Sequence, residues 1–267
     1  MPAIRPPAVA GLFYPADARQ LFHDIQEFLT EARPFDLIPK ALIVPHAGYV
    51  YSGATAATAY ATLRAASGHI RRVVLLGPTH RVAVRGLALP SDEAFDTPLG
   101  RIKLDTAAMQ SIAHLPQVVV SERVHAQEHS LEVQLPFLQS VLSDFTLLPL
   151  AVGMASSEEV AQVLESVWGG EETLIVVSSD LSHYLPYDTC QQVDSNTARA
   201  ILKLQQPISH EQACGGTPVS GLLLAAKRHH LEAHLLDLRN SGDTAGTRDQ
   251  VVGYAAFAFT GEKAHAH

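Results

Sequence analysis

The sequence predicts one α/β domain over residues 1–267, with three layers and a central, mostly parallel sheet between two layers of helices. Short apolar runs alternate along the chain with longer stretches of helical periodicity, a pattern typical of strand–helix–strand units. Three of these runs end abruptly in polar loops that contain histidine. The carboxyl ends of parallel strands share one edge of a sheet, where ligands bind in open α/β folds. The three loops therefore predict a functional site.

The first helix and strand are predicted near the N-terminus. Asp17 could cap a helix over residues 17–31, whose apolar residues fall on one face. The apolar run at residues 42–44 stops at Pro45, which favours a buried strand. Two glycines and a small-residue pattern then predict a helix over residues 54–66.

Two further strands repeat this design. The run at residues 73–76 leads into Gly77-Pro78-Thr79-His80, and the run at residues 174–177 leads into Ser178-Ser179-Asp180-Leu181-Ser182-His183. A single histidine after a strand commonly lies in an ordinary loop, so each motif alone is weak. Three strands that deliver such side chains to the same edge favour a shared site.

The remaining elements follow from caps, glycines and prolines. Residues 91–100 are polar and rich in turn formers, and we expect them to pass over the site edge. Pro136 complicates the amphipathic helix expected after residue 128. Further strands are expected at residues 86–90, 118–120, 146–152, 235–239 and 251–259, and further helices at 105–113, 129–142, 156–168, 188–204, 207–212 and 217–230.

Composition excludes several classes of function. The net charge is −8 without a cluster of Lys and Arg, so the chain lacks the electrostatic footprint of nucleic-acid binding. Its apolar runs are far too short to span a membrane, and its N-terminus has no apolar signal core. We therefore expect a cytoplasmic protein, with no nucleic-acid or membrane partner, whose two cysteines, Cys190 and Cys214, are reduced.

His46 and His80 are the strongest candidates for metal binding. Neutral imidazole is the commonest metal donor in proteins, and two rigid strand ends can hold two imidazoles on one ion. A catalytic metal needs a third protein ligand and an open position. From the residues alone, the third ligand could be any of five side chains: Cys214, Asp180, His183, Glu128 or His129.

Each of these candidates has an ordinary alternative. Cys214 precedes two glycines and a predicted helix start, which would lower its thiol pKa, but free cysteines are often buried small hydrophobic residues. Asp180 and His183 are three residues apart and would share a face if that turn is helical. The two flanking glutamates could raise the basicity of His129, although acidic residues also simply stabilise helix starts. Seven other histidines lack such a context and are expected at the surface: His69, His114, His125, His210, His229, His230 and His234.

Other enzyme classes lack their motifs here. No Gly-x-Ser-x-Gly elbow follows a strand, which argues against a serine hydrolase of the α/β type. The chain also has neither a Walker A motif nor a Gly-x-Gly-x-x-Gly dinucleotide fingerprint.

Taken together, the motifs resemble the Memo family, which in prokaryotes is called the B protein of the AmmeMemoRadiSam system. The matching segments span nearly the whole chain in order. They are residues 5–15, 44–53, 77–80, 128–138, 178–184 and 214–216, which include Pro45-His46-Ala47-Gly48, Gly77-Pro78-Thr79-His80 and Cys214-Gly215-Gly216.

The resemblance implies the fold of the catalytic subunit of class III extradiol dioxygenases, which hold non-haem Fe(II) with two histidines and one carboxylate. In this sequence the resemblance places the two metal-binding histidines at His46 and His80. The position of the dioxygenase carboxylate is occupied by Cys214. His183 matches the catalytic base, and Asp180 and His129 line the pocket. Iron is the expected metal. Because a thiolate is softer than a carboxylate, copper or zinc are the alternatives.

Two functions follow as expectations. The first is a metal-dependent oxidoreductase that resembles the dioxygenases and acts on a small oxidisable molecule. The alternative is a metal-binding or protein-interaction protein that keeps the pocket without ring cleavage. A zinc hydrolase with His183 as base is a weaker option. The sequence names neither the substrate nor the oligomeric state, although an exposed sheet edge or residues 91–100 could support a homodimer.

Overall fold

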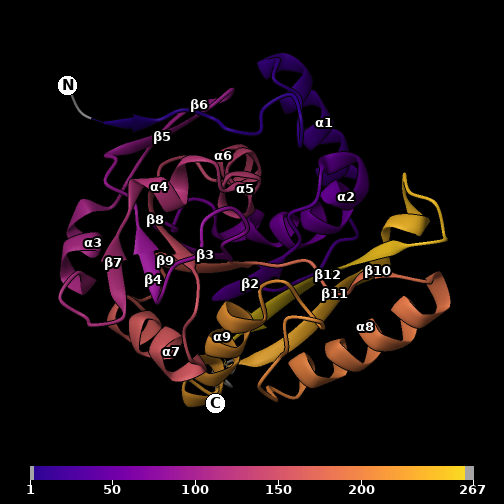
Figure 1. Cartoon of the computed structure of the whole chain (residues 1–267). Coiled ribbons are helices and arrows are strands. Elements are labelled where there is room, and N and C mark those ends of the chain that lie inside the picture. The colour runs from indigo at the N-terminus through magenta and orange to yellow at the C-terminus, as the bar shows by residue number, and fades with distance from the viewer. Residues whose placement is uncertain (1–2, 262–267) are drawn as a thin grey trace, which may run out of the picture.

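Four buried parallel strands form the centre of a nine-stranded sheet (Figure 1). The computed structural model describes residues 3–261, so the polar tail at residues 262–267 lies outside the described part. The central strands lie in the order β2, β9, β3, β8 and are nearly free of polar side chains, as expected for strands covered on both faces. They are β2 (Ala41–Val44), β9 (Thr173–Ser178), β3 (Arg72–Pro78) and β8 (Thr146–Val152).

Antiparallel pairs flank this parallel centre on both sides. β12 (Val251–Thr260) pairs antiparallel with β2 and carries β10 (His183–Leu185) and β11 (Glu232–Asn240). On the other side, β4 (Leu87–Leu89) pairs antiparallel with β8, and β7 (Val118–Val120) pairs with β4 in parallel. The α/β prediction is confirmed, and the sheet is mixed rather than mostly parallel.

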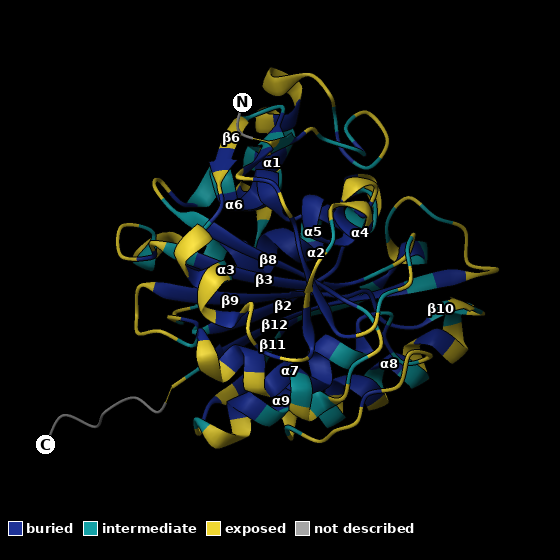
Figure 2. Cartoon of the chain, turned by 60° about the vertical axis from the view of Figure 1, so that its left-hand side comes forward, coloured by how far each residue is buried: buried dark blue, intermediate teal, exposed yellow. Residues whose placement is uncertain are grey.

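Helices cover both faces of the sheet. Along β3, Val74 and Leu76 pack into one core, whereas Val73 and Leu75 pack into the other, because successive side chains of a strand point to opposite faces. Figure 2 shows buried residues concentrated along the sheet between the helical layers. One layer contains α3 (Thr106–Ile112), α7 (Ser157–Ser166), α8 (Tyr187–Leu202) and α9 (Gly216–Arg228); the other contains α1 (Ala18–Glu31), α2 (Tyr49–Tyr60), α4 (Glu122–Ala126), α5 (His129–Glu132) and α6 (Leu135–Val141).

Several helix boundaries follow from caps that the sequence shows. The Asp17 side chain accepts a hydrogen bond from Gln20 N at 2.9 Å, as predicted for the start of α1. Ser156 and Glu159 form a reciprocal capping box at the start of α7. No helix in residues 3–261 has the length and apolarity that crossing a bilayer would require.

Three predicted elements differ in the structure. The helix expected over residues 129–142 is interrupted, and Pro136 lies in the first turn of α6, where its missing N–H costs no hydrogen bond. Residues 207–212 form no helix, and residues 210–212 form a turn instead. Residues 91–100 contribute instead to a three-stranded sheet of β1 (Ile4–Arg5), β5 (Ala94–Thr97) and β6 (Gly100–Lys103), and none of them lines a cavity at the site described below.

His125 is buried, contrary to the expectation that it lies at the surface. Its Nε2 donates to the carbonyl oxygen of Ala88 at 2.7 Å, because a carbonyl can only accept. Burial lowers the pKa of His125 to about 4, although this hydrogen bond acts in the opposite direction. The imidazole is therefore neutral in the folded protein at neutral pH.

This burial predicts a pH-dependent stability. In the unfolded chain His125 has an ordinary pKa near 6.5, so it is protonated between about pH 6.5 and pH 4. In the folded protein the same side chain stays neutral over this range. The contribution is therefore complete above pH 6.5 and falls as the pH is lowered towards 4, by up to about 1.4 kcal/mol per pH unit. We expect denaturant unfolding of His125→Gln to show a flatter pH dependence in this range. The exposed His114→Gln is the control, and equal slopes for the two variants would contradict the prediction.

Candidate metal centre

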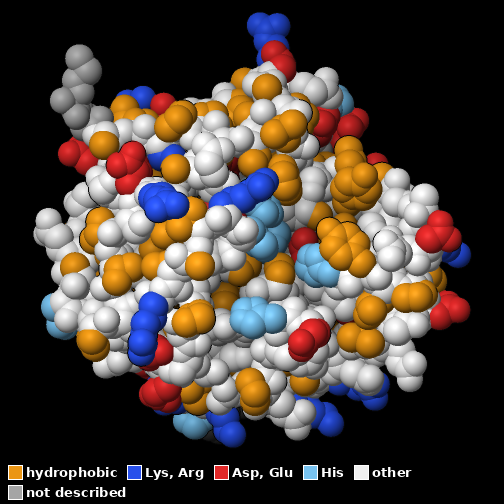
Figure 3. Space-filling model, viewed as in Figure 1, with side chains coloured by type: hydrophobic (Ala, Val, Ile, Leu, Met, Phe, Trp, Pro, Cys, Tyr) orange, Lys and Arg blue, Asp and Glu red, His pale blue; other side chains and the backbone are white. Residues whose placement is uncertain are grey.

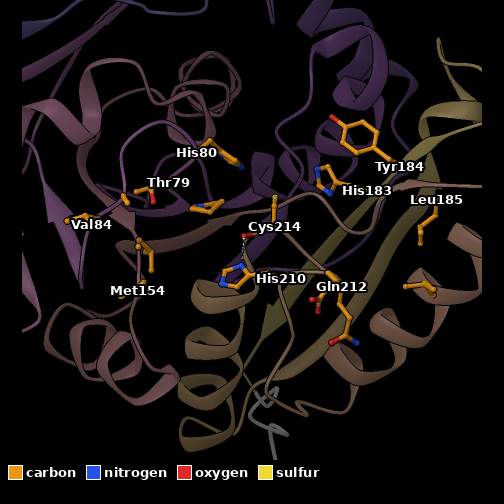
Figure 4. A pocket seen from close by; sticks show the side chains of 16 residues that line it. Thr79, His80, Val84, Met154, His183, Tyr184, Leu185, His210, Gln212 and Cys214 are labelled. Atoms are coloured by element: carbon orange, nitrogen blue, oxygen red, sulfur yellow. Dashed lines mark hydrogen bonds between the residues drawn. The ribbon is translucent and has the colours of Figure 1, made fainter.

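Three histidines and a cysteine meet at the carboxyl edge of the central strands. His46 follows β2, His80 follows β3, and one ring nitrogen from each of His46, His80 and His129 lies within 4.8 Å of the other two. Figure 3 shows histidine side chains around a hollow near the middle of this face, with hydrophobic side chains about them. In Figure 4, His80 and His183 approach one space from opposite sides, and Cys214 lies between them.

His46 has a single tautomer that its neighbours determine. Its Nδ1 lies 2.9 Å from Ser178 Oγ, which donates its only hydrogen to Ser130 O at 2.6 Å. Gln134 Nε2 also donates to Ser178 Oγ, so this oxygen can only accept from His46. The hydrogen of His46 is thus on Nδ1, and the lone pair is on Nε2. Burial lowers the pKa of His46 well below its ordinary value, so the ring is neutral.

His80 is oriented by a buried carboxylate. Its Nδ1 lies 2.9 Å from Glu128 Oε1, and its backbone N–H donates to Glu128 Oε2. Burial alone would raise the pKa of Glu128, but the hydrogen bonds from His80 and Ser130 lower it to about 2. An ionised carboxylate can only accept, so Nδ1 of His80 carries the hydrogen and Nε2 is free. With both oxygens engaged, Glu128 positions His80 and is not available as a third ligand.

His183 presents its ring to the same space. Its Nδ1 lies 2.8 Å from the carbonyl oxygen of Leu181, which can only accept, so the neutral ring has its lone pair on Nε2. The chain around it is extended, and His183 begins β10. The helical turn considered for Asp180 and His183 is therefore absent.

Asp180 contacts His46 instead. Its Oδ1 accepts a hydrogen bond from His46 N at 2.7 Å, and its Oδ2 lies 4.0 Å from His46 Nε2. Burial raises the pKa of Asp180 to about 6, although the His46 N–H favours the charged form. Asp180, in the loop that follows β9, therefore holds the His46 loop in place through this hydrogen bond.

Cys214 lies directly beside His46. Its Sγ is 3.3 Å from His46 Nε2, which has the lone pair, so the thiol is the donor. Burial raises the pKa of Cys214 to about 12, and the Asp180 carboxylate adds to this shift. The expectation of a lowered thiol pKa near a helix start was therefore wrong. The following glycine allows the close approach, because a Cβ on Gly215 would come within 2.7 Å of Ser179 Cβ.

His129 is the least satisfied member of the cluster. Its Nδ1 is buried and lies 3.4 Å from Glu128 Oε1, and it has no hydrogen-bond partner among residues 3–261. Its ring lies against Phe13 and His80, with ring centroids 4.6 Å away in both cases. Burial and the neighbouring His80 lower the pKa of His129 to about 4. Glu128 and Glu132 act in the predicted direction and raise this pKa, but burial outweighs them. A buried nitrogen without a partner fits a site that receives a further ligand.

Comparison with known proteins now identifies the family. The family model described as "Memo-like protein" matches residues 5–258. The chain belongs to the Memo family. It is 36% identical to a MEMO1 family protein of Aquifex aeolicus over 96% of this chain and 99% of that protein. It is also 36% identical to a MEMO1 family protein of Archaeoglobus fulgidus, with the same coverage.

A solved structure shares the fold of this Memo-family chain at low sequence identity. It is an uncharacterized protein from Escherichia coli K12, with a TM-score of 0.52 and 13% identity. The match covers 83% of this chain and 99% of that one. At this identity the likeness concerns the fold alone.

The donor set of this Memo-family chain fits a metal ion. The imidazoles of His46 and His80 both have their Nδ1 hydrogens engaged, which leaves Nε2 as the metal-binding atom, and a thiol lies next to one of them. Metal-binding histidines commonly donate their other ring hydrogen to a carboxylate or another acceptor, as both do here. The structure thus brings His46, His80, His129, Asp180, His183 and Cys214 together, and their individual roles remain predictions.

Sequence reasoning missed several residues that shape the site. Ser178 and Gln134 determine the His46 tautomer, and Phe13 covers His129. Ser178 is the last residue of β9, so its position at the shared sheet edge was a usable signal. Gln134 and Phe13 lie within the matching segments 128–138 and 5–15, but their contacts with the site form only in the folded chain.

Proposed function

We propose that this Memo-family protein binds one first-row metal ion through Nε2 of His46, Nε2 of His80 and Sγ of Cys214, and that it is an oxidoreductase for a small oxidisable molecule. Iron is the expected metal. The observation that carries the proposal is the pair of Nδ1 hydrogens held by Ser178 and Glu128, which leaves Nε2 as the donor atom of the buried His46 and of the exposed His80 at one edge of the sheet.

The position of the thiol supports a shared ion. Donors that bind one zinc ion at about 2.0–2.1 Å for nitrogen and about 2.3 Å for sulfur can be no more than about 4.4 Å apart. Cys214 Sγ and His46 Nε2 are 3.3 Å apart, within this limit. The set of ring nitrogens that lie within 4.8 Å of one another is that of His46, His80 and His129, so Cys214 would share the ion through its contact with His46. A bound metal would supply Lewis acidity and, for iron or copper, a redox centre.

The surrounding residues have complementary roles in this proposal. His183 has its lone pair on Nε2 and would accept a proton from a hydroxyl group of the substrate. Asp180 would hold His46 in position through its N–H. His129 would line the pocket beside His80.

Turnover of catechols tests the reaction. Iron(II)-loaded protein would be incubated with a panel of catechols under air, and ring-cleavage absorbance and oxygen uptake would be followed together. We expect turnover with wild type, and slower turnover with unchanged iron content for His183→Gln. Bound iron without turnover over a broad panel would refute the oxidoreductase proposal.

The softness of Cys214 favours a second candidate function. A thiolate binds Cu(I) or zinc well and is itself oxidisable, whereas ring-cleaving iron sites use a carboxylate. The alternative is a metal-binding or interaction protein that keeps the pocket without ring-cleaving chemistry. In the same experiment it predicts tight copper or zinc binding and no oxygen uptake.

Metal binding should release one proton in this proposal. Between about pH 7.5 and 9 ordinary histidines are already neutral, and the Cys214 thiol, whose pKa burial raises to about 12, is the ligand that must lose a proton. We therefore expect the affinity for Zn²⁺ to rise about tenfold per pH unit in this range. Calorimetric titrations in buffers of different ionisation enthalpy would count the protons. Cys214→Ala should show no such release, and an equal count in both proteins would contradict the assignment.

A further inference from the structure

Two cavities meet at the candidate metal centre. The Met154 cavity has a volume of about 840 Å³ and apolar walls of Val84, Val152, Met154, Leu185 and Val193. The Tyr51 cavity has a volume of about 670 Å³ and is walled by Leu12, Phe13, Tyr51 and Tyr254. His80, His183 and Tyr184 line both cavities, so the point between His80 and His183 opens on two sides.

We infer that the molecule bound here is extended and that it places an uncharged, apolar arm in the Met154 cavity while its reacting group lies between His80 and His183. This inference rests on the proposed function and names the class of its substrate. Either cavity alone is in the size range that holds a drug-sized ligand. A single catechol ring would leave most of this space unfilled.

The charges on the walls argue against an anionic arm. Among residues 3–261, no Lys or Arg lines either cavity, and the acidic residue Glu211 lines the Met154 cavity. Arg81 is exposed and its charge acts on His129, but it lines neither cavity. A carboxylate on the arm would lose hydration without gaining a cationic partner in the Met154 cavity.

Exposed apolar side chains support an apolar arm. Met154 is 76% exposed and Tyr184 is 67% exposed, although both line the Met154 cavity. A thioether is flexible and polarizable, so Met154 can adapt to a ligand that covers it. Figure 4 shows Met154 and Val84 on one side of the cavity and Leu185 on the other, with Cys214 between them.

The backbone conformation at Tyr184 also indicates that the boundary between the two cavities is structurally fixed. Tyr184 has φ 58°, a conformation that side chains other than glycine rarely adopt. The pairing of β10 with β12 shifts in register between His183 and Leu185, at this same residue. Such conformations persist where the surroundings fix them and are common at ligand sites. Here the irregularity places Tyr184 between the two cavities.

Binding of matched catechols to the cobalt(II)-loaded full chain tests the inference without turnover. The probes are catechol, 4-butylcatechol and 4-(2-carboxyethyl)catechol, titrated under nitrogen while the visible absorbance of cobalt is followed. Each methylene group that is fully buried strengthens binding about fourfold. We expect butylcatechol to bind at least about tenfold tighter than catechol, and the carboxylate to bind no tighter than catechol.

A matched pair of variants locates the arm. Met154→Glu should remove the tenfold advantage of butylcatechol and leave catechol binding within about twofold of wild type. Ile38→Glu is the control, because Ile38 is also exposed and apolar but lines a different cavity, near Trp168. Ile38→Glu should bind all three probes like wild type.

The outcomes separate the two proposals. If catechols shift the cobalt spectrum but the carboxylate binds as well as butylcatechol, or Met154→Glu keeps the full advantage, the inference is wrong and the proposed function stands. If cobalt binds and no catechol shifts its spectrum, the proposed function fails, and the inference fails with it.

Discussion

Replacing Cys214 or His80 with alanine is expected to weaken metal binding by more than about 100-fold. Each side chain provides one of the three proposed donor atoms, and the remaining two cannot complete a stable site. The thiol lies 3.3 Å from His46 Nε2, and the Nδ1 hydrogen of His80 is bound by Glu128, so each donor is already oriented. Competition with a chromogenic chelator would give the zinc affinity of each variant.

Two control variants distinguish a ligand from a neighbour. Asp180→Asn keeps the size of a side chain that only positions His46, so its effect should stay within the range of about 10–100-fold that is typical of such residues. Cys190→Ala removes the other cysteine, which is buried on α8 and donates to Asp194 at 3.1 Å, and it should bind zinc like wild type. If Cys214→Ala and His80→Ala also bind zinc like wild type, the site lies elsewhere.

The strand ends explain how much of the site the sequence could predict. His46 and His80 directly follow apolar runs, and a parallel sheet aligns the carboxyl ends of such runs. Their proximity could therefore be predicted from local patterns alone. Cys214 precedes a helix and follows a loop, so its place beside His46 depended on the family resemblance and on glycines that tolerate close packing.

Burial is the property that local sequence predicted least well. His125 was expected at the surface, and His129 was expected to be more basic than an ordinary histidine. Both are shielded from water and have a pKa of about 4. Burial likewise raises the pKa of Cys214 to about 12, against the expected effect of a helix start. Desolvation depends on segments that come from distant parts of the chain, such as the N-terminal residues that cover His129. Motif spacing carries no information on this.

A buried ion pair attaches that N-terminal segment to the helix of His129. The Glu132 side chain is 0% exposed and accepts hydrogen bonds from Arg5 Nη1 at 2.8 Å and from Tyr14 Oη at 2.7 Å. It also accepts from the backbone N–H groups of Ala8 and Val9. Arg5 is itself buried and donates further to the carbonyl oxygen of Glu128 at 2.9 Å. One carboxylate thus satisfies four donors.

Glu132→Ala is therefore expected to destabilise the metal-free protein by about 3–5 kcal/mol. The substitution leaves the buried Arg5 charge, a tyrosine hydroxyl and two backbone N–H groups without their acceptor. For a chain of this size, that loss corresponds to a melting temperature lower by about 6 °C or more. Glu158→Ala is the matched control, because it removes a glutamate that pairs with Arg228 at 2.7 Å on the surface, where ion pairs contribute little. A double-mutant cycle of Arg5→Met and Glu132→Leu, followed by denaturant unfolding, would measure the coupling. Equal effects for Glu132→Ala and Glu158→Ala would show that the buried pair does not hold the N-terminal segment in place.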